Sequence, residues 1–283
     1  MKRLLYFTDP HCTTRKPSSR KDDYYGSIMR KFRHIDRISR EYKVDMILCG
    51  GDLTHVPNES YTVANDLMDF LSTTWIDWKT LIGKTHDYSG NLSVGFPKSI
   101  MSILSKAGVL EAVGETYEFK LEDVKFFASH QTICPTPFFG HHILYEDLKT
   151  DANVVLISHL HMPFGITQCN GKTFVSPGSV GRNAADNFNI GRTPQCALIE
   201  CNLDEFKIEF IPLECDQDVW DEKHILRKED LKSMKTMRSM DEISAIIGNT
   251  DVVNLDSIIE SLGKKYPKDV LDEVMRLKKE AQS

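Results

Sequence analysis

The stretch VDMILCGGD, residues 44–52, decides the fold class. Its apolar run is short and nearly continuous, which is typical of a strand buried on both faces of a parallel sheet. The run ends in two glycines and a carboxylate, Asp52. We therefore expect a buried parallel strand that places Asp52 at its carboxyl end, where ligands bind in α/β proteins.

Acidic and imidazole side chains follow four other predicted strands. The strand predicted for residues 3–8 leads into Asp9-Pro10-His11. Side chains at the ends of neighbouring strands can converge on one point. Carboxylates and imidazoles suit manganese, iron or zinc, and two adjacent cations can activate water for attack on phosphorus. The ordered set therefore predicts a hydrolase with two metal ions. Its later members, after predicted strands at 78–82, 124–129 and 154–158, are His86-Asp87, His130, and His159 with His161.

The rest of the chain predicts an α/β sandwich with a helical appendage. Apolar residues recur at helical spacing over 26–42, 59–73 and 98–107. Later runs with period two predict further strands at 116–121, 173–176, 196–201 and 206–211. From about residue 216 the composition becomes charged and helical. We interpret residues 1–214 as a catalytic domain and 215–283 as a small helical region that could dock a partner.

The composition is that of an ordinary globular protein. Of 283 residues, 41% are hydrophobic and 27% charged, and no run approaches the roughly 18 apolar residues of a membrane span. Seven cysteines without C-x-x-C spacing argue for a reducing interior. We therefore expect a cytoplasmic protein with no membrane partner.

The net charge of −6 is unlike that of a general nucleic-acid binder. A phosphate-rich partner must then be attracted locally, by cations and a basic patch. Basic residues crowd the loop after His11 and continue into the first helix, where we expect them on the outward face. Phosphate contact and simple solvation both remain open for the loop, as they do for His55 and Arg182. The basic residues are Arg15, Lys16, Arg20 and Lys21 in the loop and Arg30, Lys31, Arg33, Arg37 and Arg40 in the helix.

The order D-x-H, G-G-D, H-D, H and H-x-H, over residues 1–212, resembles the calcineurin-like metallophosphoesterase superfamily. Within it, the segments 50–55 and 176–179 resemble the DNA-repair exonucleases of the SbcD type. The resemblance implies a four-layer β-sandwich flanked by helices. It also implies two divalent cations, manganese first, with magnesium, iron or zinc as alternatives.

The resemblance assigns roles to individual residues. One metal would be bound by Asp9, His11, Asp52 and His161, and the other by Asp52, His130 and His159. His86 would protonate the leaving oxygen or stabilise the transition state, with Asp87 orienting it.

One motif departs from the family pattern. The family usually has Gly-Asn-His-Asp, whose asparagine oxygen ligates the second metal, whereas residues 83–87 read GKTHD. Thr85 or Lys84 stands at the asparagine position, with one residue inserted. A hydroxyl is a poorer ligand than an amide oxygen, and lysine is none. We therefore expect the second site to bind metal weakly, to use an additional water or to recruit another oxygen, with Thr85 as a doubtful ligand.

The implied function is a manganese-dependent DNA exonuclease and endonuclease. The resemblance also implies a homodimer and an SMC-like coiled-coil ATPase as partner, docked on the helical tail. The compact length could suit a phage-type member in a host-cell cytoplasm. Two alternatives stay open. One is a metallophosphoesterase for small phosphodiesters, nucleotides or phosphoproteins, and the other is a catalytically weak scaffold that keeps the fold.

Overall fold

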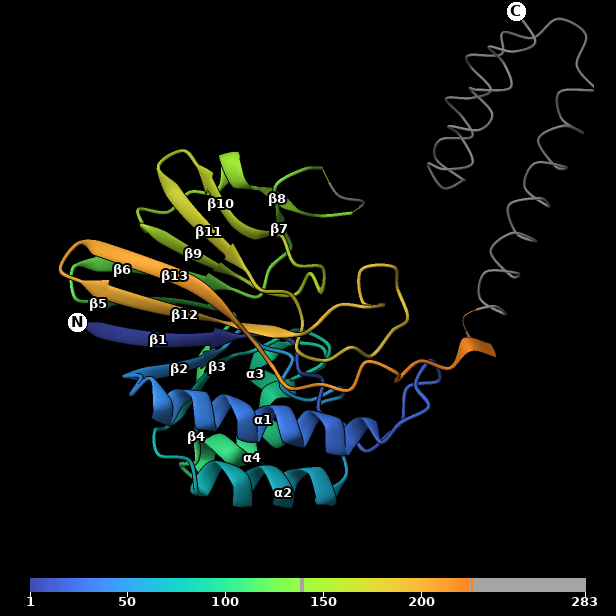
Figure 1. The fold of residues 1–283 in the computed structure, drawn as a ribbon. Helices are drawn as coiled ribbons and strands as arrows, with labels where there is room; N and C mark the ends of the chain where they lie inside the picture. Colours follow the sequence, from blue (N-terminus) through green and yellow to red (C-terminus); the bar gives the residue numbers. More distant parts are fainter. Residues whose placement is uncertain (138–139, 224, 226–283) are drawn as a thin grey trace, which may run out of the picture. The chain divides into compact units, whose positions relative to one another are not determined.

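The structure is a computed structural model and describes residues 1–137, 140–223 and 225. Within these residues two β-sheets pack face to face, and α-helices cover the outer face of one of them (Figure 1). The predicted α/β class is therefore confirmed. The predicted elements have the correct type, and their ends differ by at most two residues from the observed ones.

The first sheet has six strands in the order β13-β12-β1-β2-β3-β4. Its strands β1 to β4 run parallel, and the helices lie in the connections between them. The strands are β1 (Lys2–Phe7), β2 (Met46–Cys49), β3 (Trp78–Leu81), β4 (Leu110–Gly114), β12 (Gln195–Asn202) and β13 (Glu205–Pro212). The helices are α1 (Tyr24–Glu41), α2 (Tyr61–Ser72), α3 (Leu92–Gly95), α4 (Ile100–Lys106) and the 3-10 turn η1 (Phe96–Lys98).

The second sheet has five strands in the order β10-β11-β9-β6-β5. A short two-stranded sheet and a 3-10 turn contribute residues to a small apolar cluster on its outer face. The layer outside the five-stranded sheet, which is the fourth layer of the sandwich, is therefore not formed by an α-helix in the described part of the chain. The elements are β5 (Thr116–Leu121), β6 (Val124–Ser129), β9 (Val154–Ile157), β10 (Gly165–Cys169), β11 (Lys172–Ser176), β7 (Ile133–Cys134), β8 (Ile143–Leu144) and η2 (Tyr145–Asp147).

The strand β2 is buried on both faces, as its sequence predicts. Ile47 and Cys49 pack against the helices, while Leu48 packs between the two sheets. This alternation follows from the period of two along a strand. Each such apolar side chain contributes about 1.5–3 kcal/mol when it is fully buried. The continuous apolar run therefore fixes β2 in the centre of the sandwich.

The helices begin at side-chain caps that the sequence supplies. Asp23 accepts a hydrogen bond from the Gly26 amide at the start of α1, and Ser60 accepts one from the Val63 amide at the start of α2. Such caps contribute about 0.5–2 kcal/mol. They fix where each connection leaves the site edge of the sheet.

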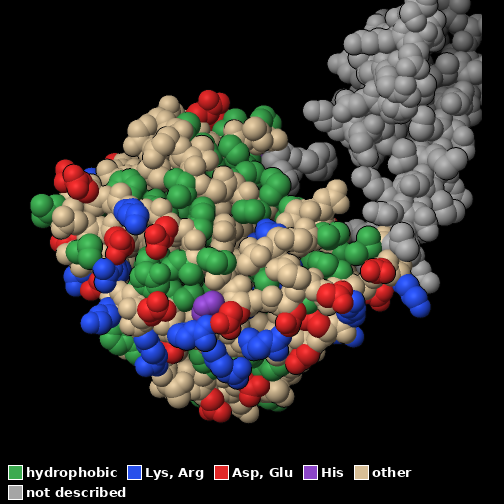
Figure 2. All heavy atoms as spheres, viewed as in Figure 1, with side chains coloured by type: hydrophobic (Ala, Val, Ile, Leu, Met, Phe, Trp, Pro, Cys, Tyr) green, Lys and Arg blue, Asp and Glu red, His purple; other side chains and the backbone are tan. Residues whose placement is uncertain are grey.

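The outward face of α1 carries Arg30, Arg33, Arg37 and Arg40, as predicted. The prediction is wrong for Lys31, which is fully buried and donates a hydrogen bond to the Val180 carbonyl at 3.0 Å. Several of the exposed arginines are paired with carboxylates. Arg30 contacts Asp216, and Arg37 contacts Glu214. In Figure 2 the blue side chains around this face are accordingly interspersed with red ones.

Both sheets belong to one unit, Met1–Trp220. Residues just beyond the predicted boundary at 214 pack onto it, because the Lys21 amide donates to the Val219 carbonyl at 2.9 Å. The predicted helical region 215–283 lies largely outside the described residues and stays a prediction. Among the described residues, no helix has both the length and the hydropathy that a bilayer span requires.

Candidate metal centre

The predicted ligands lie where strands of both sheets end. Asp9 and His11 follow β1, and Asp52 follows β2 in the six-stranded sheet. His130 follows β6, and His159 and His161 follow β9 in the five-stranded sheet. The two sheets therefore meet at this edge with carboxylates from one and imidazoles from both.

Seven ligand contributions form two groups that share one carboxylate. Within each group the ligand atoms lie within 4.8 Å of one another. The shared residue is Asp52, whose Oδ2 lies 3.6 Å from His11 Nε2 and whose Oδ1 lies 3.1 Å from His130 Nε2. The first group is Asp9, His11, Asp52 and His161, and the second is Asp52, His130 and His159.

Two of the ligand side chains, Asp9 and His130, are oriented by hydrogen bonds that leave one atom of each for the site. Asp9 Oδ2 accepts from Thr8 Oγ1 and from the His159 amide, at 2.5 and 3.2 Å. The Nδ1–H of His130 donates to the Gly50 carbonyl at 2.6 Å, because a carbonyl can only accept. Hydrogen bonds of this kind, made by the atom of the ligand that does not face the metal, fix the tautomer and direction of metal ligands.

The atoms left over fit divalent cations. Asp9 Oδ1 is buried and has no hydrogen-bond partner, and the buried atoms Asp52 Oδ1 and His130 Nε2 have no partner other than each other, at 3.1 Å. Buried polar atoms without a partner are costly, so each needs an explanation. A cation between them supplies one, and a mixed carboxylate and imidazole set suits manganese, iron or zinc. The residues present therefore fit two divalent ions.

The charges of the second group are strongly perturbed. Burial raises the pKa of Asp52, but the contacts with His130 and His11 outweigh it and hold the pKa below its ordinary value. Burial lowers the pKa of His130, but the Asp52 contact and the Asp9 charge raise it to about 10. An anionic Asp52 thus sits beside a protonated imidazole, and a cation bound between them would take the place of that proton.

Four of the ligand residues have a left-handed backbone. The φ angles are +50° for Asp9, +48° for His11, +51° for Asp52 and +69° for His159. Non-glycine residues rarely adopt this conformation, and such strain clusters at functional sites. The local turns are therefore held by the surrounding structure in a form that aims these side chains at one point.

His86 faces the first group, but Asp87 does not orient it. The Nδ1–H of His86 donates to the His55 carbonyl at 2.6 Å, and its Nε2 lies 3.9 Å from Asp52 Oδ2. Asp87 is fully buried and accepts from the amides of Asp52 and Gly83 at 2.8 and 2.7 Å. The predicted Asp87–His86 contact is therefore wrong. Asp87 instead ties together the turns after β2 and β3, and burial followed by the charge of Asp52 raises its pKa to about 8.

The motif that departs from the family places a glycine against the second group. A Cβ atom on Gly83 would lie 1.8 Å from Asp52 Oδ1 and 2.9 Å from His130 Nε2. Thr85, the doubtful ligand, is exposed with φ of +77° and belongs to neither ligand group. Sequence reasoning missed Gly83, whose only signal is a glycine directly after the third strand.

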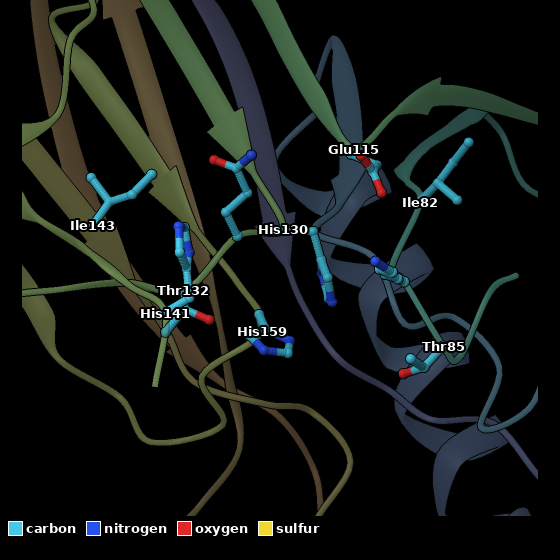
Figure 3. Close-up of a pocket in the computed structure, with 10 residues that line it drawn as sticks. Ile82, Thr85, Glu115, His130, Thr132, His141, Ile143 and His159 are labelled. Atoms are coloured by element: carbon cyan, nitrogen blue, oxygen red, sulfur yellow. The ribbon is translucent and has the colours of Figure 1, made fainter. Parts of the chain in front are cut away.

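A cavity of about 450 Å³ adjoins the second group. Figure 3 shows His130 and His159 between Thr85 on one side and Thr132 and His141 on the other. The sequence alone predicts no role in the site for His141 or Thr132. The lining also includes Lys84, Glu115 and Gln131.

A second cavity, of about 320 Å³, is lined by Arg15, Lys16 and His55. The His55 ring lies 5.5 Å from that of His11, so this cavity is beside the first group. Lys21, another basic residue of the same loop, does not line this cavity and forms an ion pair with Asp218.

Arg20 and Arg182 do not fit the predicted phosphate contacts. Both are almost fully buried, at 2% and 1% exposed. Their guanidinium groups lie 5.3 and 5.6 Å from the ring of Trp220, and Arg20 also pairs with Asp22. They hold Trp220 against the domain, and the phosphate prediction is wrong for these two residues.

Comparisons with known proteins agree with the geometry. Residues 3–202 match the family model described as the calcineurin-like phosphoesterase superfamily domain. The double-strand break repair protein mre-11 of Caenorhabditis elegans is 29% identical over 150 residues, which are 46% of this chain and 20% of that protein. The chain thus spans about a fifth of the length of this curated relative.

Solved structures with a similar fold have low sequence identity. An archaeal phosphodiesterase gives a TM-score of 0.45 at 13% identity, over 74% of this chain and 99% of the other. A Vps29 variant from Entamoeba histolytica gives 0.46 at 16%, over 77% and 99%. The phosphoesterase Yfce from E. coli gives 0.45 at 14%, over 77% and 96%. The family match covers most of the sandwich and all the ligands, and the chain belongs to the calcineurin-like phosphoesterase superfamily.

Proposed function

We propose that this chain is a two-metal phosphodiester hydrolase that cuts DNA, as a manganese-dependent exonuclease and endonuclease of the SbcD type. The observation that carries the proposal is Asp52, whose two carboxylate oxygens face different ligand groups. Two cations bound there would supply charge to neutralise phosphate oxygens and would lower the pKa of water.

His86 is the residue placed to handle the proton of the leaving oxygen. Its Nδ1–H is fixed on the His55 carbonyl, so its Nε2 is the atom presented to the site. The side chain is 30% exposed, whereas Asp52 beside it is buried. His86 can therefore reach a substrate oxygen that enters from solvent. General acid catalysis of this kind contributes about 10²–10⁴-fold to a rate.

The cavity beside the first group supports a DNA substrate. Arg15 and Lys16 are exposed and line it together with His55. Cations at such a place can contact the phosphates on one side of the reacting bond, which positions DNA without reading its sequence. The similarity to a protein named for double-strand break repair adds support for DNA as substrate.

A small phosphodiester or nucleotide is the second candidate substrate. The chain has a net charge of −6, and the outward arginines of α1 are partly neutralised by Asp216 and Glu214. A cavity of about 450 Å³ also has the size of a small-molecule site. The homodimer and the SMC-like ATPase remain predictions from the resemblance.

The test compares manganese-dependent cleavage of three substrates by the full chain. They are labelled single-stranded DNA, labelled double-stranded DNA and bis(p-nitrophenyl) phosphate. His86→Ala is the test variant. His34→Ala, on α1, is the matched control that removes an imidazole outside the site.

We expect DNA cleavage that requires manganese and His86 but not His34. Cleavage of the small ester without cleavage of DNA would favour the second candidate. A protein that binds manganese but cleaves none of the three substrates would be the scaffold alternative, and the proposal would be wrong.

A further inference from the structure

The cavity lined by Arg15 and Lys16 has two walls that come from distant parts of the chain. One wall is formed by residues 13–17, in the loop after β1, and the other by residues 183–184, between β11 and β12. His55 and Val56 complete the lining. The width of this cavity therefore depends on whatever holds the two walls at a fixed distance.

Hydrogen bonds join the two walls through residues next to them in the chain. Ser19 Oγ donates to the Asn183 carbonyl at 3.2 Å. Arg20 Nη1 donates to the Arg182 carbonyl at 2.6 Å. The Arg20 amide also donates to the Pro17 carbonyl at 2.9 Å, so Arg20 closes the turn at the end of the first wall. Arg20 and Arg182 are thus the residues through which a change elsewhere would reach both walls.

Trp220 holds these two arginines together. Both guanidinium groups lie against its indole ring, and its backbone forms an antiparallel β-bridge with Arg20. An aromatic ring attracts a cation placed over its face, and tryptophan does so most strongly. The two guanidinium groups carry like charges in a buried place, so without the ring their repulsion would favour separation. Trp220, which is 7% exposed, therefore acts as a fixed point for both walls.

We propose that Trp220 determines the preference of this centre for a polynucleotide over a small phosphodiester. It does so by holding the two walls at the distance at which Arg15 and Lys16 contact phosphates of a strand that continues beyond the reacting bond. The proposal rests on the proposed function, because the substrate is the DNA proposed there. Trp220 is a positioning residue, since it is buried and acts only through the arginines that contact it.

The salt dependence of binding separates this role from a merely structural one. Each phosphate that a cation contacts on a single strand contributes about −0.7 to the slope of log affinity against log salt concentration. Arg20 and Arg182 are too deeply buried to contact a phosphate themselves. A change in this slope on replacing Trp220 must therefore come through Arg15 and Lys16. A small ester has no phosphate beyond the reacting one, so its hydrolysis does not depend on these two residues.

The test measures how the full chain binds a fluorescently labelled single-stranded oligodeoxynucleotide, by anisotropy with manganese at several salt concentrations. Binding is measured in the His86→Ala background, so that the strand is not cut during the measurement. Trp220→Leu removes the ring but keeps an apolar side chain, and Trp220→Phe keeps a ring. Trp75→Leu, between α2 and β3 and 47% exposed, is the matched control. The double variant Arg15→Ala/Lys16→Ala defines the full loss of the two phosphate contacts.

Two further measurements use the protein with His86 intact. Manganese-dependent hydrolysis of bis(p-nitrophenyl) phosphate reports on the reaction centre alone. Titration of manganese reports on whether each variant keeps its metal sites.

We expect Trp220→Leu to weaken DNA binding by about 2- to 30-fold, the range found for residues that connect two places in a protein. The slope against salt should become less steep by up to about 1.4, about 0.7 for each of two contacts. Hydrolysis of the small ester and manganese stoichiometry should not change. Trp220→Phe should restore most of the DNA affinity, and Trp75→Leu should behave as wild type. In the Arg15→Ala/Lys16→Ala background, Trp220→Leu should have no further effect on DNA binding.

Three results would overturn the proposal. The first is a Trp220→Leu protein with the DNA affinity and salt slope of the wild type, or a chain that binds no DNA at all. The second is an equal loss on DNA and on the small ester, which would make Trp220 a structural residue. The third is an undiminished effect of Trp220→Leu in the Arg15→Ala/Lys16→Ala background.

Arg182→Lys is the second variant, in case Trp220→Leu does not fold. The Arg182 guanidinium donates to the carbonyls of Arg192 and Asp216. A lysine keeps the charge but lacks the fork that reaches both carbonyls, so it should show the same split between DNA and the small ester. Failure of the proposed function would look different: a protein with His86 intact would bind DNA in this Trp220-dependent way and would not cut it.

Discussion

Gly83→Ala is the smallest change that should disable the metal centre. It adds one methyl group at the end of β3, against the carboxylate that both ligand groups share. The added atom would lie 1.8 Å from Asp52 Oδ1. Contacts of this type essentially never fall below 3.0 Å, so the two atoms must separate by about 1.2 Å, the difference between 3.0 and 1.8 Å.

The cost should fall on both activity and stability. Asp52 is 1% exposed and its amide is fixed on Asp87, so its short side chain has little room to turn away. Displacing a reacting group by about 1 Å can lower a rate about 10²-fold. Overpacking of a filled interior costs about 1–3 kcal/mol. We therefore expect kcat/KM to fall about 100-fold and the free energy of unfolding to fall within that range.

The assays are manganese-dependent hydrolysis of bis(p-nitrophenyl) phosphate, manganese stoichiometry by titration, and urea unfolding. Gly171→Ala is the control, because Gly171 has φ of +73° in the turn between β10 and β11 and no atom near its missing Cβ. It should lose stability but keep its activity. A Gly83→Ala protein with wild-type kcat/KM and two bound manganese ions would refute the reasoning.

Four further outcomes are expected. His86→Ala should lower kcat by about 10²–10⁴-fold with unchanged manganese stoichiometry, as measured by steady-state kinetics and titration. Asp87→Asn should lower the free energy of unfolding by about 1–3 kcal/mol, because the amide nitrogen that replaces one carboxyl oxygen cannot accept a hydrogen bond from the buried backbone amides that contact Asp87, and urea unfolding measures this. Burial lowers the pKa of Lys31 to about 7 from 10.5, so at this residue the unfolded chain binds more protons between these values, and the contribution of Lys31 to stability rises with pH across that window. Lys31→Met should remove this rise in urea unfolding measured at several pH values. Raising free manganese to 100 times its dissociation constant should stabilise the metal-free protein by about 2.7 kcal/mol, visible as a higher Tm that EDTA reverses.

The positions of the ligands could be predicted because the relevant signals are local. A buried parallel strand is visible as an apolar run, and the residue after it is carried to the carboxyl edge of the sheet. Asp9, Asp52, His130 and His159 each lie within three residues after the end of a strand. Sheet topology alone then brings them together, without knowledge of any side-chain contact.

The partners of the other residues could not be predicted because they come from distant parts of the chain. Arg20 stands in a polar loop for which the sequence leaves phosphate contact and solvation both open, but Trp220, two hundred residues later, covers it. Lys31 has a helix position beside apolar residues, and only the segment at Val180 makes that position buried. Asp87 follows a histidine in a familiar motif, yet its bonds go to the amides of Asp52 and Gly83.

The ligands that follow β1 and β2 belong to one sheet, and those that follow β6 and β9 belong to the other. Bound cations would therefore act as cross-links across the sandwich, in addition to completing a reaction centre. A shear of one sheet past the other would change the spacing of the two ions directly. Rigidity of the apolar layer that contains Tyr6, Leu48 and Leu156 is thus a condition for metal spacing, although none of these residues is a ligand. Amide hydrogen exchange along β6 and β9 would measure how firmly the two sheets are held together when the metal ions are bound.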